Sequence, residues 1–175
     1  MLFGKTIVIT GVSSGIGRRT AELAGQMGAE VIGIDRVKPA HVFGAFLEGD
    51  VSTPEGVAAI AAALPARLDA LCNVAGVSGQ TGAAHTLAVN FFGLRALSEA
   101  LAPKLREGGS IVNVASIAGY GWRSNPNRAK GVAGTQGFPD PASIVAEFGV
   151  PNEAGYPVSK EILLVWTMMA AHQAQ

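Results

Sequence analysis

The sequence predicts a three-layer, doubly wound α/β fold with a parallel sheet, and two observations carry this prediction. Two apolar runs without alternation, at residues 6–10 and 30–35, are typical of strands buried on both faces of a sheet. Between them, a glycine-rich turn at 11–17 leads into an amphipathic stretch with helical spacing. Further apolar runs at 45–51, 68–74 and 110–116 alternate with helical patterns, which indicates that strands and helices continue to alternate along the chain.

The glycine-rich turn has the residue types that a phosphate-binding turn requires. Gly11 lets the chain turn sharply at the end of the strand, and Gly15 lets the backbone approach a pyrophosphate. Gly17 lets the helix lie close to the sheet, and the first helical turn offers free N–H groups to phosphates. The alternative interpretation is a tight strand-to-helix turn that binds nothing.

Asp35 ends the second apolar run, where a carboxylate can accept hydrogen bonds from an adenosine ribose diol. The same carboxylate repels a 2′-phosphate, so the predicted cofactor is NAD rather than NADP. Arg36 works against this preference, because its guanidinium can swing round to meet a phosphate.

Composition limits the class of protein. The 175 residues are predicted to form one domain, 1–175, and apolar residues make up 49% of them, which suits an intracellular α/β enzyme core. The net charge is zero, with no basic stripe, so we expect no nucleic-acid partner. No apolar run reaches the length of a membrane span, and we expect the N-terminus to enter a strand without a signal peptide. We therefore expect a cytoplasmic protein without a membrane partner.

Cysteine and histidine usage argues against a metal site. Cys72 is the only cysteine, which excludes an internal disulfide, and its apolar surroundings favour core packing over a nucleophilic role. The three histidines, His41, His85 and His172, are scattered without ligand spacing. The sequence therefore argues against a zinc-dependent alcohol dehydrogenase, which needs Cys and His ligands.

Three polar residues stand at informative places in the remaining elements. Asp50 ends the third apolar run, just before a helix that opens at residue 54, so a capping role is one interpretation. Asn90 lies within a long helix predicted over 85–106, where a buried amide needs partners, for example at a helix distortion. Gly108 and Gly109 predict a turn into the strand at 110–116. Ser116 ends that strand, where open α/β sheets bind ligands, although a serine there is often only a turn former.

Residues 117–155 are predicted to be an irregular insertion near a substrate pocket, apart from a short helix over 141–148. Trp122 and Phe138 within it suit an aromatic or polycyclic substrate, and a small satellite core is the equally weighted alternative. Pro157 is tolerated only in a first helical turn, so the last helix begins just before Tyr156. Tyr156 and Lys160 are four residues apart and therefore share one helical face.

Together these motifs resemble the short-chain dehydrogenase/reductase family over the whole chain. The turn reads T-G-x-x-x-G-I-G from Thr10, the stretch at 72–76 resembles N-N-A-G with Cys72 in place of the first Asn, and Ser116 precedes Tyr156-x-x-x-Lys160. The turn, the 31–36 stretch and the long insertion most resemble the coniferyl-alcohol dehydrogenase and bacterial 3α-hydroxysteroid dehydrogenase/carbonyl reductase group.

The resemblance implies a Rossmann sheet of order 3-2-1-4-5 and assigns the site residues. Asp50 and Val51 would lie against the adenine ring, Asn73 would stabilise the sheet, and Ala75-Gly76 would pass beneath the cofactor. Asn90 would bind a water that connects the catalytic lysine to solvent. The implied catalytic residues are Asn90, Ser116, Tyr156 and Lys160, and the implied NAD-binding residues are Gly11, Ser13, Ser14, Gly15, Ile16, Gly17, Asp35, Arg36, Asp50, Val51, Asn73, Ala75, Gly76, Tyr156 and Lys160.

The residues also support a mechanism. A free tyrosine has a pKa of about 10, and bringing a phenol to about 7 takes roughly 4 kcal/mol of preference for the phenolate. An ammonium at about 4 Å, in an effective dielectric of about 20, contributes a free energy of that size. Lys160 would supply this ammonium, Tyr156 would exchange the proton with an alcohol, and Ser116 would hydrogen-bond the substrate oxygen.

The resemblance implies a further strand, a Pro-Gly loop, a substrate lid and a final strand after the Tyr-Lys helix, so we expect the 175 residues to lack these parts. Two functions therefore stay open. The first is an NAD-dependent alcohol dehydrogenase that forms a homodimer or homotetramer and acts on an aryl-allylic alcohol of the coniferyl-alcohol type or on a 3α-hydroxysteroid. The second is a C-terminally truncated NAD-binding fragment or interaction subunit with little catalysis.

Overall fold

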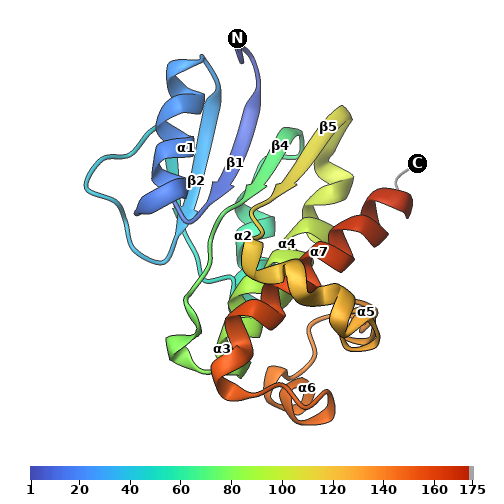
Figure 1. The fold of residues 1–175 in the computed structure, drawn as a ribbon. Coiled ribbons are helices and arrows are strands. Elements are labelled where there is room, and N and C mark those ends of the chain that lie inside the picture. The colour runs from blue at the N-terminus through green and yellow to red at the C-terminus, as the bar shows by residue number, and fades with distance from the viewer. Residues whose placement is uncertain (174–175) are drawn as a thin grey trace. The chain divides into compact units, whose positions relative to one another are not determined.

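A computed structural model, which describes residues 1–173, contains a five-stranded parallel sheet of order β3-β2-β1-β4-β5 (Figure 1). The predicted strand order and doubly wound α/β class are thereby confirmed. The chain divides into two compact units. The first comprises Met1–Ala75 and Leu94–Val114, and the second comprises Gly76–Gly93 and the chain from Ala115 onward. The single domain proposed from the sequence stays a prediction.

The sheet belongs to the first unit. Its strands are β1 (Thr6–Thr10), β2 (Glu30–Asp35), β3 (Ala45–Glu48), β4 (Leu68–Asn73) and β5 (Leu105–Asn113). Every residue of β1 is buried, as expected of a central parallel strand. Ile7 and Ile9 pack with Ala21, Ala24 and Val31 into the core between β1, β2 and the helix α1 (Gly15–Gln26).

Helices lie on both faces of this sheet. Because β-α-β crossovers are right-handed, α1 covers one face, and α2 (Pro54–Ala63) and α4 (Leu94–Leu101) cover the other (Figure 1). The α2 helix is capped at both ends. The Thr53 hydroxyl accepts from the N–H of Gly56, and Lys104 Nζ donates to the carbonyls of Ala61 and Leu64 at 2.6 and 2.9 Å.

Two strands differ from the prediction at their ends. β3 ends at Glu48, so Asp50 lies after the strand, in the turn that leads to α2. β5 begins at Leu105, so Gly108 and Gly109 lie inside the strand element and not before it. The register explains this: Leu68 pairs with Leu105 and Ala70 with Ser110, so extra residues bulge out between the two pairs, where Gly108 adopts a φ of +74°.

The long helix predicted over 85–106 is broken into four pieces. These are α3 (Ala83–Leu87), a π-helical stretch η2 (Ala88–Gly93), α4 and a 3₁₀ turn η3 (Ala102–Lys104). Pro103 lies in η3, and its ring and missing N–H do not allow the α-helix to continue. Asn90 lies in the π-helical stretch, which is the kind of distortion considered for this residue.

The second unit is largely helical. Besides η1 (Gly79–Thr81), α3 and η2, it contains η4 (Ile117–Ser124), α5 (Pro126–Ala133), α6 (Pro141–Glu147), η5 (Asn152–Ala154) and α7 (Gly155–Gln173). The short helix near 141–148 is confirmed, whereas η4 and α5 lie where irregular chain was expected. The proline at the start of α5 suggested a loop, but it occupies the first helical position, behind an Asn125 side-chain cap.

The helices of the second unit surround a core that includes Phe91, Phe92, Val132 and Ile162. Trp122 and Phe138 pack against this core, and the rings of Phe92 and Phe138 lie 5.9 Å apart. Of the two interpretations of these aromatic residues, the structure shows the satellite core. No helix within residues 1–173 combines the length and the apolar character needed to cross a membrane.

Candidate active site

The glycine-rich turn after β1 has the steric properties expected of it. Gly11 and Gly15 adopt φ values of +78° and +54°, in the left-handed region that favours glycine. A Cβ at Gly11 would lie 2.9 Å from the Cα of Ala75, and a Cβ at Gly17 would overlap the carbonyl oxygen of Gly11. The turn therefore admits no side chain at Gly11 or Gly17.

At the start of α1, the side chain of the N-cap residue does not cap the backbone N–H groups of the first turn. Ser14 is the N-cap in extended conformation, and its hydroxyl accepts no capping hydrogen bond. The first turn of α1 contains no acidic residue, and Ile16 is 65% exposed. Such a helix start favours a bound anion, which is the role predicted for these residues.

The Asp35 carboxylate lies at the end of β2 and is held by its neighbours. Its Oδ2 accepts hydrogen bonds from the N–H and the hydroxyl of Ser13 at 2.9 and 2.8 Å, and its Oδ1 accepts from the N–H of Arg36 at 2.8 Å. The Arg36 side chain is exposed. The structure thus orients the acid that was predicted to select NAD, and it joins that acid to the glycine-rich turn through Ser13.

The other predicted cofactor residues of the first unit lie at the ends of β3 and β4. Asp50 Oδ1 accepts from the N–H of Ser52 at 2.8 Å, and Val51 is buried. Asn73 is buried, and its Nδ2 donates to Ser98 Oγ and to Asn113 Oδ1, both at 2.9 Å. Asn73 therefore links β4 to α4 and to β5, which fits a sheet-stabilising role.

Sequence reasoning missed the role of Thr10. Its Oγ1 accepts from the N–H groups of Val74 and Ala75, both at 3.0 Å, and so ties the end of β1 to the turn after β4. The threonine that precedes Gly11 in the motif was the available signal. Ser98 was also missed, because nothing in the sequence of α4 points to Asn73.

The predicted catalytic residues, together with Gly76, all belong to the second unit. Lys160 is 5% exposed, and its Nζ lies 5.8 Å from the centroid of the Tyr156 ring. Burial lowers the pKa of Lys160 below its ordinary value, because a charged ammonium is poorly solvated there. The two side chains share one face of α7, as their spacing predicted.

Asn90 connects two parts of the second unit through its side-chain amide. Its Oδ1 accepts from the N–H of Val77 at 2.8 Å, and its Nδ2 donates to the carbonyl of Val77 at 3.0 Å and to Ser159 Oγ at 3.2 Å. Ser159 Oγ in turn donates to the carbonyl of Tyr156 at 2.7 Å. The amide thus joins the π-helical stretch to the helix of Tyr156, and its predicted part in a proton relay stays a prediction.

Ser116 caps η4, and its Oγ accepts from the N–H of Ala118 at 3.2 Å. The hydroxyl proton is not used in this bond, so it can be donated to a substrate oxygen. η4 packs closely on α7, because a Cβ at Gly119 would lie 2.6 Å from the carbonyl oxygen of Lys160. The structure thereby brings Asn90, Ser116, Tyr156 and Lys160 into one unit.

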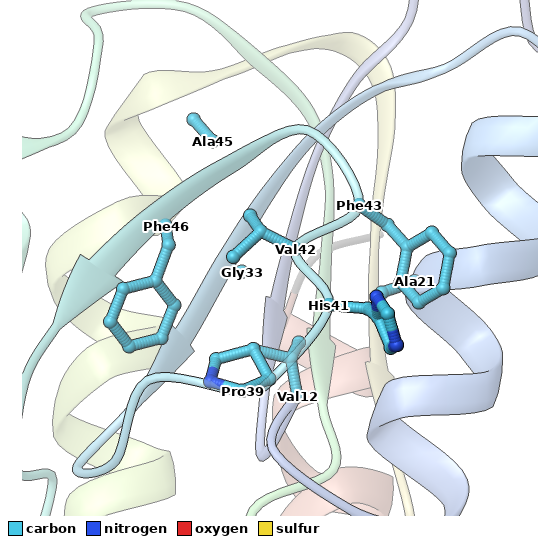
Figure 2. A pocket seen from close by; sticks show the side chains of 9 residues that line it. All are labelled: Val12, Ala21, Gly33, Pro39, His41, Val42, Phe43, Ala45 and Phe46. Carbon is cyan, nitrogen blue, oxygen red and sulfur yellow. The ribbon is translucent and has the colours of Figure 1, made fainter.

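A small pocket lies in the first unit between α1, β2, β3 and the loop between these strands. Figure 2 shows that its lining is apolar apart from one imidazole; the lining includes Val12, Gly33, Pro39, His41, Phe43 and Phe46. The pocket volume is about 200 Å³, with the open mouth included. This volume is smaller than the roughly 300–1,000 Å³ of typical ligand pockets. It holds none of the predicted catalytic residues.

The described residues, 1–173, contain no cluster of three or more His, Cys, Asp or Glu side chains that could hold a metal. Cys72 lies half-buried in β4, and burial raises the pKa of its thiol, which fits packing better than nucleophilic chemistry.

The parallel sheet of order β3-β2-β1-β4-β5, the glycine-rich turn after β1 and the oriented acid at the end of β2 define a Rossmann-type α/β protein. Comparison with known proteins narrows this class. Residues 5–129 match the short chain dehydrogenase family profile. The chain belongs to the short-chain dehydrogenase/reductase family of oxidoreductases.

Individual relatives agree with this assignment. The chain is 40% identical over 172 residues to coniferyl-alcohol dehydrogenase of Pseudomonas sp. (strain HR199 / DSM 7063), covering 98% of this chain and 68% of that protein. The 3-alpha-hydroxysteroid dehydrogenase from Pseudomonas sp. B-0831, solved as a complex with NADH, is 32% identical with a TM-score of 0.71, over 95% of this chain and 70% of that one. A Pseudomonas aeruginosa RhlG/NADP complex shows the same fold at 23% identity and a TM-score of 0.73, over 98% and 68%.

Proposed function

We propose that this protein is an NAD-dependent alcohol dehydrogenase that interconverts an alcohol and its carbonyl compound, with Tyr156 as the general acid and base. The observation that carries the proposal is the placement of the buried Lys160 ammonium 5.8 Å from the centroid of the Tyr156 ring. A nearby cation favours the phenolate, the form that accepts a proton from an alcohol.

The chemistry follows from the side chains of the second unit. Tyr156 removes the hydroxyl proton of the alcohol, and Ser116, whose Oγ is the acceptor in its bond with Ala118, donates its hydroxyl proton to the substrate oxygen. NAD, when bound, supplies the acceptor for the hydride that leaves the carbinol carbon. Lys160 also holds the nicotinamide ribose, and Asn90 completes the path by which the proton reaches solvent.

We assign the cofactor to the residues of the glycine-rich turn, to Asp35 and Arg36, and to Asp50, Val51, Asn73, Ala75 and Gly76. The Asp35 carboxylate favours NAD, because its charge opposes a 2′-phosphate. The solved relative bound to NADH supports this choice, whereas the relative bound to NADP shares only the fold at 23% identity.

The proposed substrate is either an aryl-allylic primary alcohol of the coniferyl-alcohol type or a 3α-hydroxysteroid. The support is the identity of 40% to a coniferyl-alcohol dehydrogenase and of 32% to a 3-alpha-hydroxysteroid dehydrogenase. We also propose a homodimer or homotetramer in the cytoplasm, and analytical ultracentrifugation of the purified chain tests the oligomeric state.

The test is NAD reduction by the purified protein with coniferyl alcohol, cinnamyl alcohol and a 3α-hydroxysteroid, each compared with Tyr156→Phe. Loss of the phenolic oxygen removes the general base, so we expect turnover to fall by about 10²–10⁴-fold. NAD affinity, measured by calorimetry, changes little, because the ring remains. Substantial residual turnover in Tyr156→Phe contradicts the assignment, and NAD binding without any turnover by the wild type favours a binding protein.

A further inference from the structure

The residue after Lys160 carries a nearly buried carboxylate. The side chain of Glu161 is 10% exposed, and its Oε2 accepts a hydrogen bond from Arg128 Nη2 at 3.0 Å. Arg128 comes from α5, in the insertion that follows Ser116, and its own side chain is 18% exposed. A charge-assisted hydrogen bond therefore joins the insertion to α7 directly beside Lys160.

The second oxygen of the same carboxylate, Glu161 Oε1, lies against η4. A Cβ at Gly121 would lie 2.8 Å from Glu161 Oε1, just as a Cβ at Gly119 would lie 2.6 Å from the Lys160 carbonyl oxygen. The two glycines thus let η4 rest on α7 at two consecutive residues, Lys160 and Glu161. We call the group formed by Gly119, Gly121, Arg128 and Glu161 the Glu161 clamp.

Stability alone gives a poor account of this clamp. A buried ion pair gains little over an apolar pair of similar size, because both charges lose their hydration. Arg128 Nε is buried and has no hydrogen-bond partner within the described residues, 1–173, which lowers the gain further. What the pair supplies is geometry, since the carboxylate is held by η4 on one side and by α5 on the other.

We propose that the Glu161 clamp sets the position of the Ser116 segment against the helix of Tyr156 and Lys160. Ser116 caps η4 three residues before Gly119, so a shift of η4 along α7 moves the Ser116 hydroxyl relative to the Tyr156 phenol. Arg128 and Glu161 are positioning residues, because neither is placed at the reacting atoms. This inference rests on the proposed function.

The first test compares Arg128→Gln and Glu161→Gln with Arg128→Lys and with Lys130→Gln. Lys130 is an exposed cation two residues beyond Arg128 on α5, so its variant is a matched change of charge. At a temperature where every variant is folded, we expect Arg128→Gln and Glu161→Gln to lower kcat about tenfold while KM changes less than about threefold. Arg128→Lys recovers part of the loss, and Lys130→Gln has the wild-type kcat. Wild-type kcat in both Gln variants overturns the proposal, because a merely structural pair affects stability alone.

The second test needs no turnover. Amide hydrogen exchange at Gly119 and Gly121 is measured in the wild type, Glu161→Gln and Lys130→Gln, and we expect faster exchange in Glu161→Gln alone. Equal exchange in all three overturns the clamp, whereas a wild type that shows no turnover overturns only the proposed function. If Arg128→Gln fails to fold, Gly121→Ala replaces it, because the added Cβ displaces the carboxylate while both charges remain; its expected loss in kcat is the same.

Discussion

The two units of this protein hold their predicted functional residues by different means. In the first unit the key contacts are made by backbone and by short side chains, as where Gly17 packs on the Gly11 carbonyl and Ser13 holds Asp35. In the second unit long side chains are buried and connected, as with Lys160, Asn90 and the Arg128–Glu161 pair.

This difference has a physical origin. A phosphate is bound by N–H groups whose directions follow from backbone dihedral angles, so glycines in a short turn can prepare the site. An acid–base group needs a set charge and a set distance, and these depend on neighbours from several helices. Substitutions in the first unit should therefore lower stability and binding mainly through steric overlap. Substitutions in the second unit should lower stability and turnover mainly because buried polar groups lose their hydrogen-bond partners.

The largest effect is expected from Gly17→Ala. The added Cβ overlaps the carbonyl of Gly11, so the turn or the helix must move, and we expect a loss of about 2–3 kcal/mol in the free energy of unfolding and weaker NAD binding. Gly25→Ala on the same helix is the matched control, because nothing lies within 4 Å of its added Cβ. It should stabilise the protein by up to about 1 kcal/mol. Chemical denaturation measures both, and similar losses in the two variants would contradict the steric account.

A second comparison uses the polar connection in the second unit. Asn90→Ala leaves the N–H and carbonyl of Val77 without their amide partner and should cost about 2 kcal/mol of stability and much of kcat. Ser159→Ala removes the hydrogen bonds of Ser159 Oγ to Asn90 Nδ2 and to the Tyr156 carbonyl but leaves both bonds between Asn90 and Val77, so we expect a cost of about 1 kcal/mol and a smaller loss in kcat. Thermal unfolding and steady-state kinetics measure both, and an Asn90→Ala variant with wild-type stability would show that these hydrogen bonds contribute little.

Cofactor choice gives a third test, centred on the first unit. Asp35→Asn removes the charge that opposes a 2′-phosphate, so the preference for NAD over NADP should fall by about tenfold, or about 1.4 kcal/mol. Glu48 pairs with Asp35 across β2 and β3 and is exposed, so Glu48→Gln removes a nearby charge as the control. Dissociation constants for both dinucleotides are compared. An equal change in the two variants would mean that cofactor preference depends on the total negative charge of this region and not on the position of the Asp35 carboxylate.

The smallest effects concern pH, and the two units respond at opposite ends of the scale. Hydrogen bonds from the Thr6 N–H and from Lys5 lower the pKa of Asp69 in the first unit. Its contribution to stability is therefore present above its ordinary pKa near 3.8 and is lost as the pH falls through the lowered value. Asp69→Asn should therefore reduce the loss of stability that accompanies a fall to acid pH.

Lys160 in the second unit changes stability in the same direction, but at alkaline pH. Burial lowers its pKa, so the folded state holds fewer protons than the unfolded state between the lowered value and the ordinary value near 10.5. Stability should rise with pH across that window, and Lys160→Met should remove the rise. Urea denaturation at a series of pH values tests both residues, and an unchanged alkaline profile in Lys160→Met would contradict the assigned burial.

Local patterns were sufficient for much of the fold, and together with the family resemblance they gave the identities of the proposed site residues. The apolar runs predicted the five strands, the glycine spacing predicted the turn, and Pro157 located the start of α7 near Tyr156. The bulge at Gly108 was not predictable, because it depends on the register between β4 and β5. The short helices η4 and α5 also escaped, since packing against other elements stabilises them more than their own propensity does. A helix distortion at Asn90 was one interpretation of the sequence, but its π-helical form was not predicted.

The sequence by itself determined where the strands lie along the chain, the glycine turn and the acidic, basic and hydroxyl side chains of the proposed site, because those features depend on residues close together in the chain. The tertiary structure alone decided the partners of these groups. Thr10 bonds residues 64 and 65 positions away, Asn90 bonds Ser159 at a separation of 69, and Arg128 meets Glu161 at a separation of 33. Such contacts have no local signature, since they form only when the folded backbone brings distant segments within hydrogen-bond distance.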